Sequence, residues 1–172
     1  MIKRDRLTGT TGAIVSFAVI INRAAMAAIA IGFVATWLAP QFFMALLAEG
    51  GLGADQAALA GVRLFMLLGI ATAIAADRLL IALAAIVTAA GAGDPFASDN
   101  ARRLRMMAWA LLALQLLDLP YALLAGHWPA LGGEGPDFDI SLGGWIATLT
   151  LFVLARAFDA GSAMRDDLAG TV

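Results

Sequence analysis

Asp118 and Gln115 are the residues whose type and spacing come closest to a chemical site. They stand three residues apart in an apolar stretch, so a helix would place both on one face. An ionisable side chain inside a membrane helix is costly and suggests a function by default, here a polar cavity or a proton relay. The alternative is a structural pair between Asp118 and Arg63. We favour this alternative, because polar groups often join membrane helices.

Arg23 and Asp77 form a second candidate pair, near the inner face of the membrane. A salt bridge between them would fix how the first two helices pack, and we favour that role over transport. A transporter would be expected to show inverted repeats or broken helices, and the sequence displays neither.

The remaining candidates for metal or catalytic chemistry are weak. Glu134, Asp137 and Asp139 could offer oxygen ligands to a divalent cation, but they lack the spacing of a calcium loop, so a solvated acidic loop is expected. His127 is the single histidine and the chain has no cysteine. Disulfides, thiolate nucleophiles and multi-histidine metal centres are thereby excluded. We therefore expect no enzyme activity, no metal and no cofactor.

The composition identifies the environment of the chain. Of its 172 residues, 62% are hydrophobic and 14% are charged, and the mean hydropathy is +0.87. A soluble domain of this size cannot bury so much apolar surface, so the surrounding medium must be lipid. Because a spanning helix needs about 20 mostly apolar residues, the sequence predicts one transmembrane domain over residues 1–172, with spans at about 17–38, 57–78, 105–124 and 142–160.

The second span is expected to be unusually long. Asp77 and Arg78 interrupt its apolar run, which then continues to residue 92. Either one long helix leaves the bilayer at its lower end, or residues 79–92 form a separate span. A separate span would be too short and would leave no room for a turn, so we favour one helix. The apolar patch 42–47 is expected along the outer surface, followed by a glycine-rich loop at 49–55.

The topology follows from the basic residues. Residues 39–55 and 125–141 contain no Lys or Arg, whereas the N-terminus, residues 91–105 and the C-terminal segment hold most of them. The positive-inside rule therefore places both termini and residues 91–105 in the cytoplasm. The predicted fold is all-α: an integral membrane four-helix bundle with both termini cytoplasmic and the second helix extended into the cytoplasm.

Residues 91–105, here called the elbow, read GAGDPFASDNARRLR and form the main polar break between two apolar blocks. Asp94 before Pro95 fits a helix N-cap followed by a first-turn proline, and residues 98–100 offer a second set of caps. The arginines at 102, 103 and 105 could dock a cytoplasmic protein or anionic lipid heads. Their charge is equally explained by topology, since it holds the start of the third span inside.

The elbow also resembles a known family. Its GDPF, Asn100 and the run RRLR at 102–105 resemble the signature of a bacterial membrane family catalogued as domain of unknown function 2975. The end of the chain is similar to the closing pattern of that family, at Phe158, Gly161, Arg165, Asp166, Asp167, Leu168, Gly170, Thr171 and Val172. The resemblance covers most of the second half of the chain. It implies a four-pass protein, often encoded beside a helix-turn-helix regulator, with no established activity.

We therefore expect a non-enzymatic protein of the bacterial inner membrane whose partners are the lipid bilayer and, by the resemblance alone, a helix-turn-helix transcriptional regulator. The elbow is too short to be a nucleic-acid site. The expected contact surface consists of Asp94, Pro95, Phe96, Asn100, Arg102, Arg103, Arg105, Asp166 and Asp167. Small residues at 143, 144 and 147 could pack helices within one bundle or in a homo-oligomer. The alternative function is a small transporter or channel component that uses Asp118 and Gln115.

Overall fold

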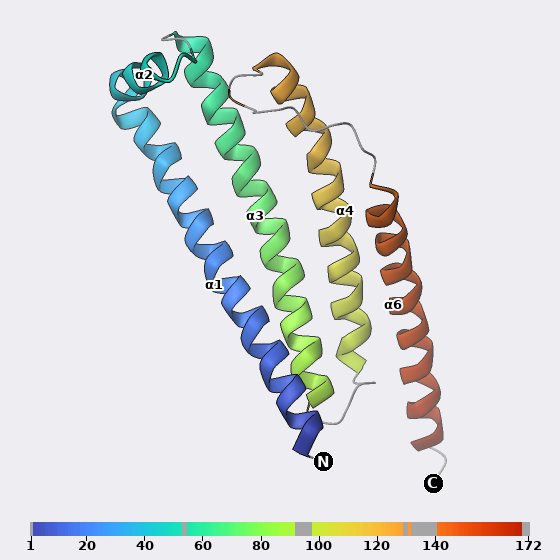
Figure 1. Ribbon diagram of the computed structural model, residues 1–172. Coiled ribbons are helices and arrows are strands. Elements are labelled where there is room, and N and C mark those ends of the chain that lie inside the picture. The colour runs from blue at the N-terminus through green and yellow to red at the C-terminus, as the bar shows by residue number, and fades with distance from the viewer. Residues whose placement is uncertain (1, 53–54, 92–97, 129–130, 132–140, 170–172) are drawn as a thin grey trace. The chain divides into compact units, whose positions relative to one another are not determined.

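The computed structural model describes residues 2–52, 55–91, 98–128, 131 and 141–169, and the side chains of 11–52, 55–91, 99–128, 131 and 141–164. Within these residues the chain is helical and contains no strand (Figure 1). The helices are α1 (Ile2–Leu38), α2 (Pro40–Glu49), α3 (Gln56–Gly91), α4 (Ser98–His127) and α6 (Leu142–Ala169).

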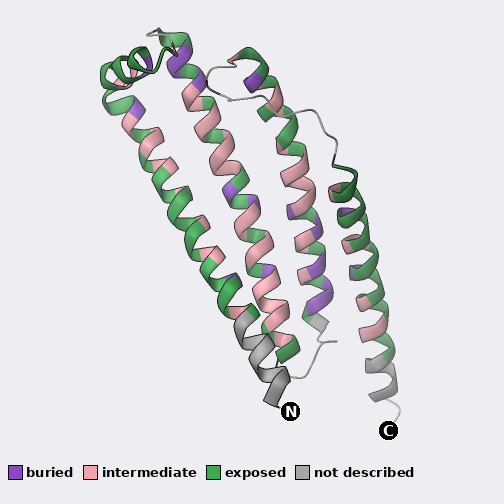
Figure 2. Cartoon of the chain, viewed as in Figure 1, coloured by how far each residue is buried: buried purple, intermediate pink, exposed green. Residues whose placement is uncertain are grey.

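Four of these helices are long and apolar enough to cross a membrane. The candidate spans are Thr11–Leu38, Gln56–Gly91, Asp99–His127 and Leu142–Met164. Only 6% to 11% of the most apolar window of each span is buried, and most of the helical surface is exposed or half-buried (Figure 2). A polypeptide with so much exposed apolar surface is compatible with a multi-pass membrane protein.

The prediction of one continuous second helix is confirmed. The helix α3 runs for 36 residues, through Asp77 and Arg78, without a break. At a rise of about 1.5 Å per residue it is roughly 54 Å long, which exceeds the ~30 Å hydrocarbon core of a bilayer. The other helices also extend beyond the predicted spans, because a hydrogen-bonded helix continues past the last apolar residue where no proline or turn stops it.

Short-range signals in the sequence set several helix boundaries. The Asp55 carboxylate accepts a 2.7 Å hydrogen bond from the Ala58 amide and caps α3, and the Ser141 hydroxyl accepts a 3.1 Å bond from the Gly144 amide and caps α6. Pro40 occupies the first turn of α2, where its missing N–H costs nothing. The predicted patch at 42–47 is thus part of a helix of its own.

The end of α2 is a Schellman motif. The amide of Gly51 bonds the Ala48 carbonyl at 3.0 Å, and the amide of Leu52 bonds the Leu47 carbonyl at 2.9 Å. Gly51 has a φ of 72°, a left-handed conformation that glycine adopts without steric cost. Leu52 packs against the cluster that contains Leu47, which is the apolar contact that accompanies this motif. The predicted loop therefore starts at Gly50, one residue later than expected.

The described contacts fall into two compact units. Unit 1 comprises Met1–Asn22, Ala75–Ala113 and Ser141–Val172, and unit 2 comprises Arg23–Ile74 and Leu114–Ile140. The long helices contribute to both, so each unit is a set of helix segments that pack side by side.

In unit 2, α1 and α3 pack along an antiparallel seam. Ile29 lies against Gly69, Met66 lies against Gly32, and Arg63 bonds Thr36. The residues on α3 are three apart and therefore share one face of that helix. The two glycines let the facing side chains approach closely, and their hypothetical Cβ atoms would lie 3.4 Å and 3.6 Å from the nearest side-chain atom.

The start of α3 is the best-buried part of unit 2. Leu59 is fully buried, and together with Leu47 and Ala58 it forms an apolar cluster between α2 and α3. Phe65 of α3 meets Tyr121 of α4 edge to face, with ring centroids 5.5 Å apart. Such aromatic pairs favour a defined geometry and help to fix α4 beside α3.

In unit 1, the first half of α4 is buried on one face. Ala101, Leu104 and Ala108 recur at helical spacing and are almost completely inaccessible. Trp109 of α4 packs edge to face on Phe152 of α6, with ring centroids 5.3 Å apart. Small side chains at such positions let membrane helices pack closely.

Candidate functional sites

The polar residues of the elbow that lie on α4 divide into exposed residues and residues packed against the protein. This helix begins at Ser98, so residues 98–100, predicted as caps, lie inside its first turn. Asp94, Pro95 and Phe96 lie outside the described residues. Arg102 and Arg105 are three residues apart and both exposed, whereas Asn100 is buried and Arg103 is half-buried.

Arg103 and Asn100 form a polar contact between α4 and α3. Arg103 Nη1 donates to the Asn100 Oδ1 atom at 2.9 Å and to the Ala85 carbonyl at 3.1 Å. Asn100 is only 1% exposed, so its side chain is not available to a partner protein. These two residues therefore hold α4 against α3. Of the predicted contact residues in the described part of the elbow, Arg102 and Arg105 are the exposed ones.

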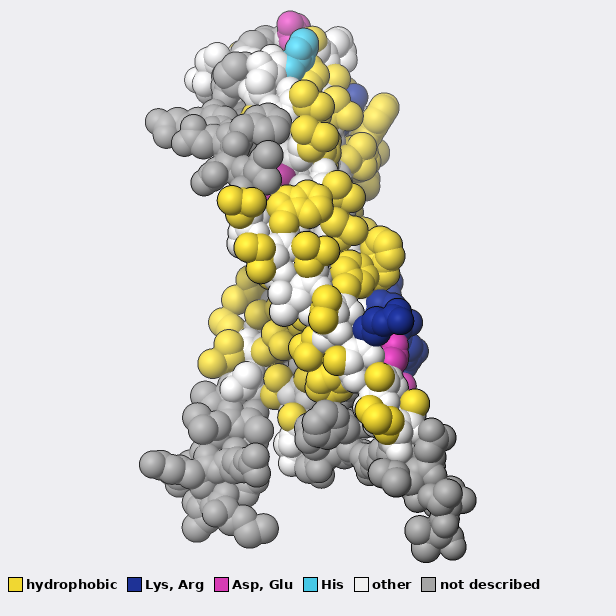
Figure 3. Space-filling view, turned by 90° about the vertical axis from the view of Figure 1, so that its right-hand side faces the viewer, with side chains coloured by type: hydrophobic (Ala, Val, Ile, Leu, Met, Phe, Trp, Pro, Cys, Tyr) yellow, Lys and Arg dark blue, Asp and Glu magenta, His cyan; other side chains and the backbone are white. Residues whose placement is uncertain are grey.

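Arg102 and Arg105 each pair with a carboxylate on the protein surface. Arg102 lies 3.5 Å from Asp99, one turn earlier on α4, and Arg105 bonds Asp159 of α6. All four side chains are about half exposed or more. In Figure 3, basic and acidic side chains lie next to each other on a face that is otherwise largely hydrophobic. The result is an exposed charged patch, defined here as Asp99, Arg102, Arg105 and Asp159.

The C-terminal part of the predicted contact surface is helical in its backbone. The helix α6 continues to Ala169 and so includes Asp166 and Asp167, whose side chains lie outside the described part of the chain. The helix is longer than the predicted span at 142–160, since the polar segment that follows Ala160 keeps helical backbone geometry.

Arg63 contacts α1, not Asp118. Its Nε donates to the Thr36 hydroxyl at 3.1 Å and its Nη2 donates to the Thr36 carbonyl at 2.7 Å. The guanidinium carbon also lies 3.9 Å from the centre of the Trp37 ring, within cation–π range. The predicted structural pair between Arg63 and Asp118 is absent from the described residues, because the last turn of α1 offers a carbonyl and an aromatic face instead.

Asp118 is exposed on α4, and Gln115 is half-buried one turn earlier. Asp118 makes no hydrogen bond or ion pair with another described residue, while Gln115 does have an interaction. Leu116, Leu119 and Leu123, in the same part of α4, are also exposed. The carboxylate therefore faces outward from its helix.

Two further features expected from the sequence, the Arg23–Asp77 pair and the acidic loop, stay predictions. The Arg23–Asp77 pair would join residues of the two units, and neither side chain is without a partner. The acidic residues 134, 137 and 139 lie outside the described part of the chain. Among the described residues, no group of three or more His, Cys, Asp or Glu could hold a metal ion.

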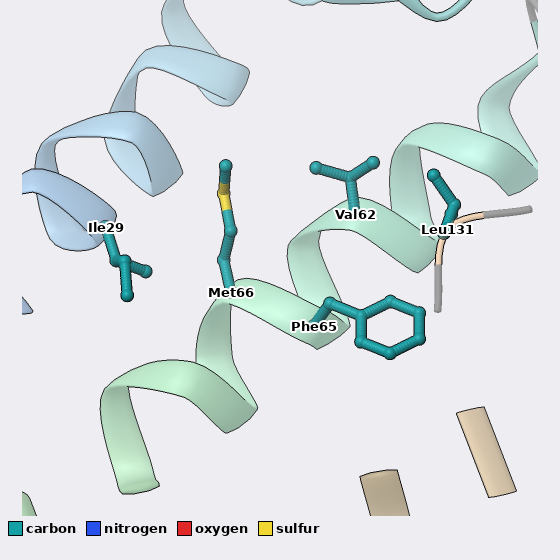
Figure 4. A pocket seen from close by; sticks show the side chains of 5 residues that line it. All are labelled: Ile29, Val62, Phe65, Met66 and Leu131. Carbon is teal, nitrogen blue, oxygen red and sulfur yellow. The ribbon is translucent and has the colours of Figure 1, made fainter. Parts of the chain in front are cut away.

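Sequence reasoning missed two features of unit 2. The first is the contact of Trp128 and Leu131 with Gly61, where a Cβ atom would lie only 2.9 Å from each side chain. The second is an apolar pocket of about 280 Å³ lined by Ile29, Val62, Phe65, Met66 and Leu131 (Figure 4). The small residues at the start of α3, among them Gly61, are the signal that could have indicated a close approach at this point.

No protein-family model matches the chain, and no curated protein or solved structure matches it either. The resemblance carried by the elbow and by the C-terminal segment therefore stays a prediction.

Proposed function

We propose that this protein is a non-enzymatic, multi-pass protein of the bacterial inner membrane that contacts a cytoplasmic partner through the charged patch at the start of α4 and through its C-terminal segment. The observation that carries the proposal is the division of the elbow into inward and outward residues. Asn100 and Arg103 serve the packing of α4 on α3, whereas Arg102 and Arg105 remain on the surface.

The charge pattern supports a protein partner. Exposed ion pairs contribute little to stability, so folding alone gives little reason to keep several of them together. They can exchange their intramolecular partner for an intermolecular one and give an interface its orientation. A helix-turn-helix regulator as that partner rests on the family resemblance, and the positive-inside rule supports a cytoplasmic patch.

Site-specific crosslinking in living cells tests the proposal. Photoreactive groups at positions 102 and 105 should capture one discrete protein, whereas the same group at Ala101, which is 1% exposed, should not. In a separate pull-down with the unlabelled protein, reversal of charge at 102 and 105 together with deletion of residues 166–172 should abolish capture of the helix-turn-helix regulator. Capture that persists in that variant would contradict the contact surface.

A second candidate function rests on Asp118. An exposed carboxylate on a candidate span is costly in lipid, which favours a functional role. The alternative function is therefore a path for protons or ions at a contact with another protein. In reconstituted vesicles, Asp118→Asn should then abolish a proton- or ion-dependent flux while the protein stays folded. An unchanged flux, or no flux in the native protein, would remove this alternative.

A further inference from the structure

Arg63 carries a charge that no described carboxylate neutralises. Within the described residues its partners are the hydroxyl and carbonyl of Thr36 and the ring of Trp37. A guanidinium has five N–H donors, and Nη1 makes no hydrogen bond to another described residue. Unit 2 contains one other Lys or Arg residue, Arg23, at the far end of the α1 segment. A charged donor therefore remains for a negatively charged ligand.

The position of Arg63 along the helices corresponds to the level of lipid headgroups. Thr36 and Trp37 occupy the last turn of α1, which ends at Leu38, and Trp37 is 62% exposed. Exposed tryptophans are typical of the membrane–water boundary. On α3, Arg63 lies roughly 10 Å from the first residue of the helix, Gln56, at ~1.5 Å per residue. Both helices thus place the guanidinium near one end of their candidate spans.

The apolar pocket starts next to this charge. Val62 precedes Arg63 and Met66 follows it by three residues, so the pocket begins within one turn of the arginine. It extends to Ile29, which contacts α3 at Gly69, about two turns farther along the seam. In Figure 4 the side chains of Ile29, Met66, Val62 and Leu131 line this space one after another.

The pocket is unsuited to water. All five lining side chains are apolar, and a water molecule is stable in a cavity only where about two to four polar partners bind it. A pocket of about 280 Å³ on a membrane helix is instead open to hydrocarbon chains. A flexible acyl chain fills such a space without burying any polar group.

We infer that Arg63 and the pocket together form a binding site for an anionic phospholipid, with the phosphate on the guanidinium and one acyl chain against Met66, Val62 and Ile29. Charge complementarity selects an anionic headgroup, and the adjoining apolar space selects a lipid over a free phosphate. The site shares no residue with the charged patch on α4, so the inference does not depend on the proposed function.

Fluorescence quenching by brominated lipids tests this site, because Trp37 stacks on Arg63 and Trp128 packs on the start of α3. The variant Trp109→Phe/Trp145→Phe keeps these two reporters alone. It is reconstituted in phosphatidylcholine vesicles with increasing fractions of acyl-brominated phosphatidylglycerol or acyl-brominated phosphatidylcholine. Half-maximal quenching should need about fivefold less of the anionic lipid, the factor expected for one basic side chain near a headgroup.

Variants in the reporter background separate the two parts of the site. In Arg63→Gln, half-maximal quenching should need the same fraction of either lipid. Arg63→Lys should keep most of the preference for the anionic lipid. Val62→Phe, which fills the pocket and leaves the charge, should lower the maximal quenching by either lipid. Arg156→Gln, which removes an exposed arginine in unit 1, should change nothing.

Equal midpoints for the two lipids in the reporter variant would overturn the inference, as would a preference that persists in folded Arg63→Gln. If Arg63→Gln does not reconstitute, Val62→Phe decides: quenching unchanged from the reporter variant would overturn the acyl-chain site. Inorganic phosphate in the buffer should not reduce the preference. If it abolishes the preference, the ligand is a free anion and the lipid site is wrong.

Discussion

Arg63 Nη2 donates a 2.7 Å hydrogen bond to the carbonyl oxygen of Thr36, which joins the start of α3 to the last turn of α1. That carbonyl belongs to the group of C-terminal acceptors that have no partner within their own helix. The positive guanidinium also lies at the negative end of the α1 dipole. One side chain thus caps α1, neutralises part of its dipole and fixes the register of the seam.

Replacement of Arg63 by alanine is expected to lower the free energy of unfolding by about 2 kcal/mol, the value of a hydrogen bond to a charged group. Arg63→Lys should lose about half of this, because an ammonium cannot make the forked contact with both Thr36 oxygens. The measurement is SDS-induced unfolding in mixed micelles. As a matched control, Thr36→Val removes only the hydroxyl acceptor and should cost less than Arg63→Ala. An equal or larger cost for Thr36→Val would show that the carbonyl contact contributes little.

Gly61→Ala should destabilise unit 2 by about 1–3 kcal/mol, because the new methyl group overpacks the contact with Trp128 and Leu131. The fluorescence of Trp128 should change at the same time, since its indole must leave the α3 backbone. Gly126 provides the control, as a Cβ atom there meets nothing within 4 Å. Gly126→Ala should leave stability unchanged or raise it slightly through helix propensity. Equal effects of the two substitutions would contradict the close packing at Gly61.

Arg103→Ala and Asn100→Leu should each lower stability by about 1–3 kcal/mol, because each leaves a half-buried or buried polar partner unsatisfied. Arg102→Ala should change stability by less than about 0.5 kcal/mol, as its ion pair with Asp99 is exposed. The measurement is thermal unfolding of the three variants in detergent, monitored by circular dichroism. A large effect of Arg102→Ala alone would reverse the assignment of inward and outward arginines.

Asp118→Leu is expected to leave the stability of the isolated protein unchanged or to raise it. The carboxylate makes no contact with another described residue, and an Asp at the centre of a membrane helix disfavours insertion by about 3 kcal/mol. Insertion efficiency and SDS unfolding measure the two effects. Gln115→Leu is the comparison, and it should be destabilising because Gln115 does have a partner. A clear loss of stability in Asp118→Leu would indicate a structural partner for this carboxylate.

The amino-acid sequence by itself determined the helical class, the four candidate spans and the continuity of α3. These features follow from local hydropathy and from the rule that a helix satisfies its own backbone, so they need no knowledge of neighbours. The caps at Asp55 and Ser141 are equally local. The sequence also placed the elbow between two spans, although the residues at its centre lie outside the described structure.

Only the tertiary structure decided which polar residues face inward. Arg102, Arg103 and Arg105 have the same chemistry, and the register of α4 on α3 alone makes Arg103 the packed one. The partner of Arg63 is 27 residues away and includes a backbone carbonyl. Every residue has a carbonyl, so residue types cannot indicate which one lies at an arginine. Complementary charge therefore predicted that Arg63 pairs with Asp118, whereas in the structure Arg63 contacts the end of α1.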